Sequence, residues 1–123
     1  MTIPLTGIQY DIEAGDYRAT VTELGAGLRE LMVTGVPLVT SYDADQLPPH
    51  GAGQLLSPWP NRVDGGRYSF GGTGYQLALS EPASGNAIHG LTRWIPWLRV
   101  RPWIALPLAG SESASWYPVP PKE

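Results

Sequence analysis

Two short loops of the sequence carry the side chains best suited to hydrogen bonding and proton transfer. Asn61 and Arg62 follow a proline-rich run in SPWPNRVDGG, residues 57–66, and His89 lies in GNAIHGLTRW, residues 85–94. A guanidinium donates hydrogen bonds from a planar fork, an asparagine amide both donates and accepts, and imidazole exchanges protons near neutral pH. These three residues are therefore the candidate site residues.

The two prolines around Trp59 stiffen the first loop. Each proline fixes its own φ and restricts the residue before it to extended geometry, so both Ser57 and Trp59 lose conformational freedom. A stiff loop loses little further entropy when a ligand binds, which favours a binding role for Asn61 and Arg62. A rigid surface turn that carries an ordinary arginine is the alternative interpretation.

The sequence contains two histidines, and their contexts differ. His89 lies between Ile88 and Gly90, where the missing side chain of glycine allows a ligand or a backbone segment to approach closely. Proton transfer at a hydroxyl or ring oxygen is the chemistry that imidazole would supply there. Taken alone, this context favours a structural, hydrogen-bonded histidine. His50, in LPPHGAG at residues 47–53, is interpreted as part of a surface loop.

Residue types and spacing exclude several other kinds of site. The chain has no cysteine, so it forms neither disulfides nor thiolate metal sites. His50 and His89 are far apart in the sequence and have no carboxylate cluster beside them, which argues against a metal site. No serine has a Gly-x-Ser-x-Gly context, and GGTGY at 71–75 lacks the helix and lysine of a phosphate-binding loop. We expect no cofactor and no metal.

Length and charge restrict the class of protein further. The chain has 123 residues, enough for one domain at most, and its net charge of −3 provides no basic surface for a phosphate backbone. We expect no nucleic-acid partner, although the alternation of arginine and tryptophan over residues 93–103 is a pattern that single-strand binders also show. The N-terminus lacks a basic segment followed by an apolar run, and no stretch is apolar enough to span a membrane. We expect a cytoplasmic protein with no membrane partner.

Alternation of apolar and polar residues predicts strands, and no stretch shows a sustained helical period. Apolar side chains occupy every second position over residues 8–12 and 17–21. Residues 28–33 and 36–40 flank Thr34-Gly35, and residues 68–70 and 75–79 flank a glycine-rich turn, which predicts two β-hairpins. The predicted fold class is all-β and antiparallel.

The candidate residues and the aromatic content together favour a sugar ligand. The chain contains 5 Trp and 6 Tyr, whose ring faces can cover the apolar side of a pyranose. Asn61 and Arg62 would hold neighbouring ring hydroxyls, and His89 would act at the anomeric end.

Residues 51–97 closely resemble the N-terminal portion of aldose 1-epimerases, also called galactose mutarotases. The resemblance depends on an ordered series of motifs: Pro-Trp-Pro-Asn-Arg, Gly-x-Tyr-x-Phe, Tyr-Gln-Leu, Ala-Ile-His-Gly-Leu and Arg-Trp. It implies an antiparallel β-sandwich of the galactose mutarotase-like type, present only in part, from an isomerase that interconverts the α and β anomers of hexoses without a cofactor. The implied substrate is an aldohexose such as glucose or galactose, and the implied setting is hexose metabolism.

The resemblance also implies roles for individual residues. In the family, a carboxylate removes the proton of the anomeric hydroxyl while a histidine protonates the ring oxygen, and the ring opens and closes again. Asn61, Arg62 and His89 match residues that hold the sugar, and His89 is the catalytic candidate. The family's general-base glutamate, second histidine and sugar-binding aspartate come from later segments, and nothing after Trp97 is matched to them.

We expect family sequence over residues 1–97 and an irregular Pro/Ser-rich tail of other origin over residues 98–123. Catalysis by a chain truncated in this way is expected to be impaired, because losing one proton-transfer group typically costs ~10² to 10⁴ in rate. Unpaired strand edges are expected to favour self-association. A non-catalytic carbohydrate-binding β-domain is the alternative function.

Overall fold

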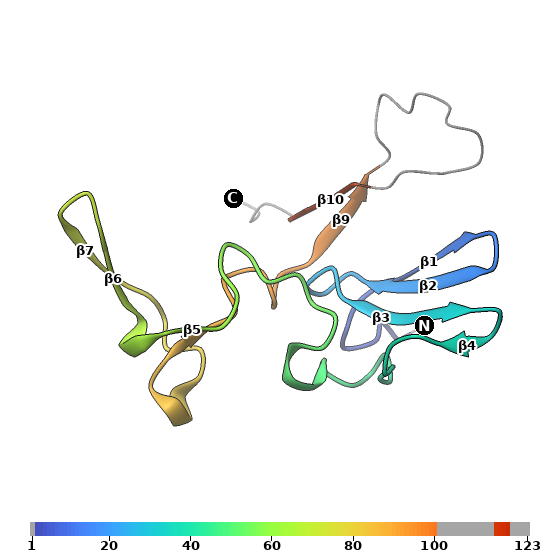
Figure 1. Cartoon of the computed structure of the whole chain (residues 1–123), viewed down its shortest axis with the longest axis horizontal. Coiled ribbons are helices and arrows are strands. Elements are labelled where there is room, and N and C mark those ends of the chain that lie inside the picture. Colours follow the sequence, from blue (N-terminus) through green and yellow to red (C-terminus); the bar gives the residue numbers. More distant parts are fainter. Residues whose placement is uncertain (1, 101–114, 119–123) are drawn as a thin grey trace. The chain divides into compact units, whose positions relative to one another are not determined.

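The computed structural model describes residues 2–100 and 115–118, and these residues are all-β, as the sequence predicts. They form antiparallel strand pairs and three 3₁₀ turns, which are η1 (Pro49–Gly51), η2 (Asp64–Gly66) and η3 (Pro82–Ser84). The described residues divide into two compact units. Unit 1 contains residues 2–55, 94–100 and 115–118, and unit 2 contains residues 56–93. Figure 1 shows the strands of each unit in sequence colours.

Unit 1 is built on a sheet of four consecutive antiparallel strands. In spatial order these are β1 (Gln9–Ala14), β2 (Tyr17–Thr22), β3 (Leu28–Val33) and β4 (Val36–Pro37). Gly15 and Gly35 have φ of 57° and 80° in two of the hairpin turns, a conformation that glycine adopts at little cost. The predicted strands are confirmed, but the fourth ends at Pro37 and not at Thr40. One further backbone hydrogen bond follows it, from the N–H of Leu38 to the carbonyl oxygen of Leu31 at 2.8 Å.

Period-2 alternation gives this sheet an apolar and a polar face. Ile12 and Ala19 are cross-strand neighbours on the apolar side, and both are half-buried. Glu13 and Arg18 are cross-strand neighbours on the polar side, where they form an ion pair of 3.2 Å. The alternation read from the sequence therefore corresponds to the two faces of the sheet.

The interior of unit 1 contains buried hydroxyl groups. Thr6 and Thr22 are fully buried. The hydroxyl of Thr22 donates to the carbonyl oxygen of Leu24 at 2.9 Å and accepts from the backbone N–H of Gly27 at 3.2 Å. A Cβ at Gly27 would collide with this hydroxyl. Thr22 therefore organises the connection between β2 and β3.

Unit 1 also contains the antiparallel pair β9 (Trp97–Val100) and β10 (Ser115–Pro118). Trp97 is buried, and its backbone N–H donates to the carbonyl oxygen of Glu23 at 2.8 Å. The expectation of an irregular tail concerned residues 98–123, and most of that segment lies outside the described residues. Where the segment is described, at 98–100 and 115–118, it is strand.

Unit 2 consists of two short antiparallel strand pairs. Its strands in chain order are β5 (Arg62–Val63), β6 (Arg67–Phe70), β7 (Thr73–Gln76) and β8 (Ala87–Ile88). β5 pairs with β8, and β6 pairs with β7. The β6–β7 pair is the second predicted hairpin, and it turns at Gly71 and Gly72. Because these two glycines suffice for the turn, β7 begins earlier than predicted, at Thr73, and it ends at Gln76 and not at the predicted Leu79.

Within residues 2–100 and 115–118, the structure contains no helix with the length and apolar character needed to cross a membrane. Over the same residues, no three His, Cys, Asp or Glu side chains are grouped as metal ligands.

Candidate functional site

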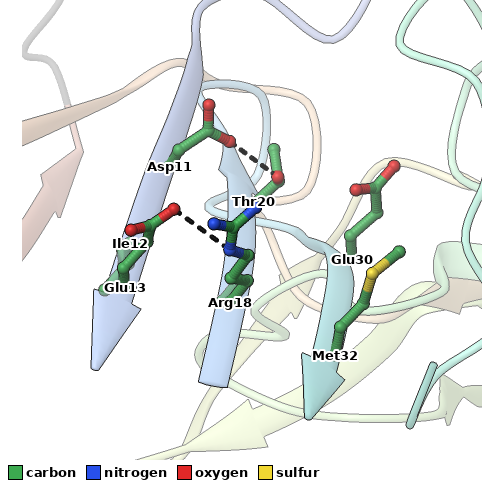
Figure 2. Close-up of a pocket in the computed structure, with 8 residues that line it drawn as sticks. Asp11, Ile12, Glu13, Arg18, Thr20, Glu30 and Met32 are labelled. Atoms are coloured by element: carbon green, nitrogen blue, oxygen red, sulfur yellow. Dashed lines mark hydrogen bonds and ion pairs between the residues drawn. The ribbon is translucent and has the colours of Figure 1, made fainter. Parts of the chain in front are cut away.

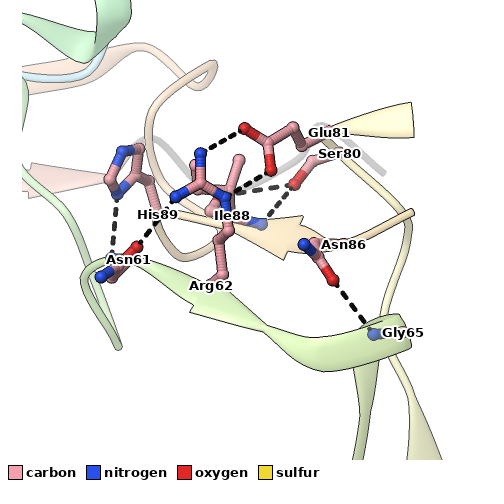
Figure 3. Close-up of polar contacts among 8 residues, drawn as sticks. All are labelled: Asn61, Arg62, Gly65, Ser80, Glu81, Asn86, Ile88 and His89. Carbon is pink, nitrogen blue, oxygen red and sulfur yellow. Dashed lines mark hydrogen bonds and ion pairs between the residues drawn. The ribbon is translucent and has the colours of Figure 1, made fainter. Parts of the chain in front are cut away.

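The β5–β8 pair brings the two candidate loops together. Arg62 on β5 is in register with Ile88 on β8, so the antiparallel ladder places Asn61 opposite His89. The backbone N–H of His89 donates to the carbonyl oxygen of Asn61 at 2.9 Å. The three site residues predicted from the sequence therefore lie in one cluster of unit 2 (Figure 3).

Hydrogen bonds also join the segment before β5 to the segment after β8. The backbone N–H of Leu91 donates to the carbonyl oxygen of Ser57 at 2.7 Å, and the hydroxyl of Thr92 accepts from the backbone N–H of Ser57 at 3.3 Å. Gly90 is the residue between His89 and Leu91 in the chain. A Cβ at Gly90 would overlap the carbonyl oxygen of Ser57. This close approach of the two loops requires glycine at position 90.

Asn61 and His89 both have left-handed backbone conformations, with φ of 62° and 60°. Such values are uncommon for residues with a side chain, although asparagine and histidine adopt them more often than most. Gly90 follows with φ of 74°. His50, in a surface loop, has a similar φ of 52°, so this conformation accompanies the turns at the ends of β5 and β8 and does not by itself mark a ligand site.

The imidazole of His89 is held in one tautomer. Its Nδ1 accepts a hydrogen bond from the backbone N–H of Asn61 at 3.0 Å, so in the neutral ring the proton is on Nε2. Burial is the largest cause that lowers the pKa of His89; the positive charges of Arg93 and Arg62 lower it further, and Glu81 raises it. His89 is therefore neutral at pH 7 and presents an N–H donor at Nε2.

Arg62 is paired with the carboxylate of Glu81, which no sequence motif marks as a site residue. Its Nε and Nη2 donate to Oε2 and Oε1 of Glu81 at 2.6 and 2.7 Å, which is a bidentate contact. The hydrogen bond from Arg62 is the largest cause that lowers the pKa of Glu81. The third guanidinium nitrogen, Nη1, lies 3.4 Å from the side-chain oxygen of Asn61. The polar contacts therefore run from Glu81 through Arg62 and Asn61 to His89.

The turn before β8 positions Glu81. The backbone N–H of Glu81 donates to the carbonyl oxygen of Asn86 at 2.9 Å, across the 3₁₀ turn η3. The sequence signal for this turn is SEPASGN at 80–86, with a proline near its start and a glycine near its end. That signal predicts a turn, but the contact of Glu81 with Arg62 depends on the pairing of β5 with β8, which no local spacing reveals.

Two further polar side chains support the same strand pair. The hydroxyl of Ser80 accepts from the backbone N–H of Ile88 at 2.9 Å, and the side-chain oxygen of Asn86 accepts from the backbone N–H of Gly65 at 3.2 Å. Figure 3 shows both contacts beside the Arg62–Glu81 pair. The strands that carry the site are therefore fixed by side chains as well as by their own ladder.

A separate hollow of about 250 Å³ lies on β1–β3 of unit 1 (Figure 2). Its polar groups bond to one another: Arg18 pairs with Glu13 at 3.2 Å, and the hydroxyl of Thr20 donates to Asp11 at 2.7 Å. Its lining contains none of the predicted site residues. These are ordinary cross-strand contacts within one sheet, so we place the candidate site at Asn61, Arg62 and His89.

His50 and Trp59 lie outside the polar cluster of Asn61, Arg62, Glu81 and His89. His50 is exposed in η1, in agreement with its interpretation as part of a surface loop. Trp59 is half-buried between its two prolines. A role for Trp59 or another aromatic ring in covering a sugar stays a prediction.

Comparison with known proteins identifies the family of the chain. The family profile described as Aldose 1-epimerase matches residues 9–104, which include every candidate site residue and extend past Trp97. The Uncharacterized protein YihR of Escherichia coli (strain K12) is 42% identical over 92 residues, which cover 75% of this chain and 30% of YihR. A galactose mutarotase-like protein from Clostridium acetobutylicum, of known structure, is 25% identical with a TM-score of 0.67.

The structural match covers 85% of this chain and 34% of the Clostridium protein. The chain thus spans about a third of the length of these two relatives. The partial galactose mutarotase-like β fold that the resemblance implied is confirmed, and the chain belongs to the aldose 1-epimerase family.

Proposed function

We propose that Asn61, Arg62 and His89 form part of a sugar-binding site, and that this site serves the interconversion of the α and β anomers of an aldohexose. The observation that carries the proposal is the direct contact between the two loops, where the backbone N–H of Asn61 reaches Nδ1 of His89 at 3.0 Å. Residues from distant parts of the sequence thereby offer N–H donors within one cluster. A pyranose offers its ring oxygen and neighbouring hydroxyls as acceptors for such donors.

Each residue has a separate part in the proposed binding. The Nε2–H of neutral His89 donates to an oxygen at the anomeric end of the sugar. Nη1 of Arg62 and the side-chain amide of Asn61 hold adjacent hydroxyls. Negative charge develops on the ring oxygen as its bond to the anomeric carbon breaks, and a hydrogen bond to that oxygen then becomes stronger. In this proposal, His89 both binds the sugar and assists ring opening.

Two measurements on the chain of 123 residues test the proposal. Titration with glucose and with galactose, followed by tryptophan fluorescence, measures binding. Polarimetry on the freshly dissolved α anomer measures mutarotation. Arg62→Ala should weaken binding by at least about tenfold, since a hydrogen bond to a charged group contributes roughly 1.5–3 kcal/mol.

Arg18→Ala is the matched control, because Arg18 also belongs to an ion pair but lies on the sheet of unit 1. It should leave sugar affinity unchanged. Equal affinity in Arg62→Ala and the unaltered chain would remove Arg62 from the site, and failure of the unaltered chain to bind either sugar would contradict a sugar site. Binding without faster mutarotation would favour the carbohydrate-binding alternative over the enzyme.

A further inference from the structure

The carboxylate of Glu81 receives hydrogen bonds from Nε and Nη2 of Arg62 at 2.6 and 2.7 Å. We propose that Glu81 is a positioning residue, which holds the guanidinium of Arg62 in the orientation that binds the sugar. This inference rests on the proposed function, because it concerns the same site. It adds a fourth residue, which makes no contact with the sugar itself and positions Arg62 to make one.

The bidentate contact fixes the guanidinium in two respects. A guanidinium held by one nitrogen can still rotate about that contact, whereas two parallel hydrogen bonds define both its plane and its direction. The Arg62 side chain is 50% exposed, so packing alone does not immobilise it. With Nε and Nη2 bound to Glu81, Nη1 is directed toward the side-chain oxygen of Asn61, 3.4 Å away. Glu81 therefore determines which nitrogen faces the cluster.

Glu81 is itself held firmly enough to act in this way. Its backbone N–H donates to the carbonyl oxygen of Asn86 at 2.9 Å, and its carbonyl oxygen accepts from the backbone N–H of Ser84 at 3.1 Å. Its side chain is 24% exposed. The hydrogen bond from Arg62 is the largest cause acting on the pKa of Glu81 and lowers it, while burial acts in the opposite direction. The group is thus a fixed carboxylate, ionised at neutral pH.

The charge of Glu81 also acts on His89, so the pKa of His89 is a second quantity that reports the presence of this charge. The charged groups that act on His89 are Arg93 and Arg62, which lower its pKa, and Glu81, which raises it. Removal of the negative charge should therefore lower the pKa of His89 further. A residue that only filled space at position 81 would not have this effect.

The ion pair of Glu13 and Arg18 in unit 1 provides a matched comparison. It has a contact of 3.2 Å, and its side chains are 65% and 75% exposed. Exposed pairs of this kind contribute little order or stability. Glu13→Gln removes the same functional group as Glu81→Gln and changes nothing in the candidate site.

Sugar titrations of the 123-residue chain, with glucose and with galactose, give the main test. Glu81→Gln keeps the shape of the side chain but loses the charge, and it should weaken binding about tenfold, while Glu13→Gln should have no effect. Glu81→Asp retains a carboxylate with a shorter reach and should fall between the unaltered chain and Glu81→Gln. Because Glu81 acts through Arg62, the double variant Arg62→Ala/Glu81→Gln should bind no more weakly than Arg62→Ala alone.

Nuclear magnetic resonance supplies two measurements that need no sugar. In the unaltered chain, the Nε–H of Arg62 should exchange with solvent more slowly than that of Arg18. In Glu81→Gln, this exchange should become faster and the pKa of His89 should fall. The comparison of Arg62 with Arg18 needs no variant, so it tests the ion pair even if Glu81→Gln fails to fold.

Three results would overturn the positioning role: equal sugar affinity in Glu81→Gln and the unaltered chain, additive losses in the double variant, or exchange of the Arg62 Nε–H as fast as that of Arg18. Failure of the unaltered chain to bind either sugar is a different result and overturns the proposed function. The exchange comparison would then still decide whether Glu81 holds Arg62.

Discussion

The backbone N–H of Asn61 donates a hydrogen bond to Nδ1 of His89, and the backbone N–H of His89 donates one in return to the carbonyl oxygen of Asn61. The imidazole is therefore oriented by the main chain of the opposite loop and not by a mobile side chain. The imidazole takes this orientation only when β5 and β8 are paired, because the pairing brings the N–H of Asn61 to Nδ1 of His89. This coupling makes the state of His89 a sensitive indicator of the fold of unit 2.

The pKa of His89 should lie below the ordinary value for imidazole. Burial lowers it most, and the positive charges of Arg93 and Arg62 act in the same direction. The unfolded chain therefore binds this proton more readily than the folded chain. The contribution of neutral His89 to the free energy of unfolding should be fully present above about pH 6.5 and should be lost as the pH falls through the lowered pKa. Titration of the ring by nuclear magnetic resonance, with urea unfolding at several pH values, measures both. A raised pKa for His89 would contradict the geometry.

His89→Asn should separate folding from binding. The asparagine side-chain oxygen can accept the hydrogen bond from the N–H of Asn61, and asparagine tolerates the left-handed φ of 60° found at position 89. We expect the free energy of unfolding to change by less than about 1 kcal/mol. Sugar affinity should fall about tenfold, because the donor at Nε2 is lost. His50→Asn, at an exposed residue with φ of 52°, is the control and should change neither quantity.

Gly90→Ala should destabilise unit 2 more than Gly85→Ala does. Both glycines have positive φ, 74° and 66°, so both substitutions impose backbone strain of roughly 1–2 kcal/mol. A Cβ at Gly90 would in addition overlap the carbonyl oxygen of Ser57, whereas a Cβ at Gly85 has no neighbour within 4 Å. Urea denaturation of the two variants compares the losses. Equal losses would mean that the approach of Gly90 to Ser57 is not tight in solution.

Thr22→Val should destabilise unit 1. Valine has the shape of threonine without the hydroxyl, so the backbone N–H of Gly27 would lose the acceptor that Thr22 provides at 3.2 Å. Loss of a partner for a buried donor costs about 1–3 kcal/mol, which thermal or urea unfolding detects. Thr73→Val, at an exposed position of β7, is the control and should have little effect. A similar stability for both variants would show that solvent reaches Gly27.

The strands were predictable from the sequence because their signals are local. Alternation over residues 8–12 and 17–21 depends only on near neighbours, and glycines such as Gly35 mark the turns between strands. The limits of the strands were less predictable. β4 ends at Pro37 and β7 begins at Thr73, because backbone pairing and not side-chain pattern sets where a ladder stops.

At the site, residue types and their neighbours along the chain identify the donors: Asn61 and Arg62 after a stiff loop, and His89 before a glycine. How these groups meet depends on the pairing of β5 with β8 in the folded chain. Register across β5 and β8 placed the N–H of Asn61 on the ring of His89, 28 positions away, and the carboxylate of Glu81 on Arg62, 19 positions away. Residue type and local period describe what a segment can do, whereas contacts between segments depend on pairing over a distance that no local pattern records.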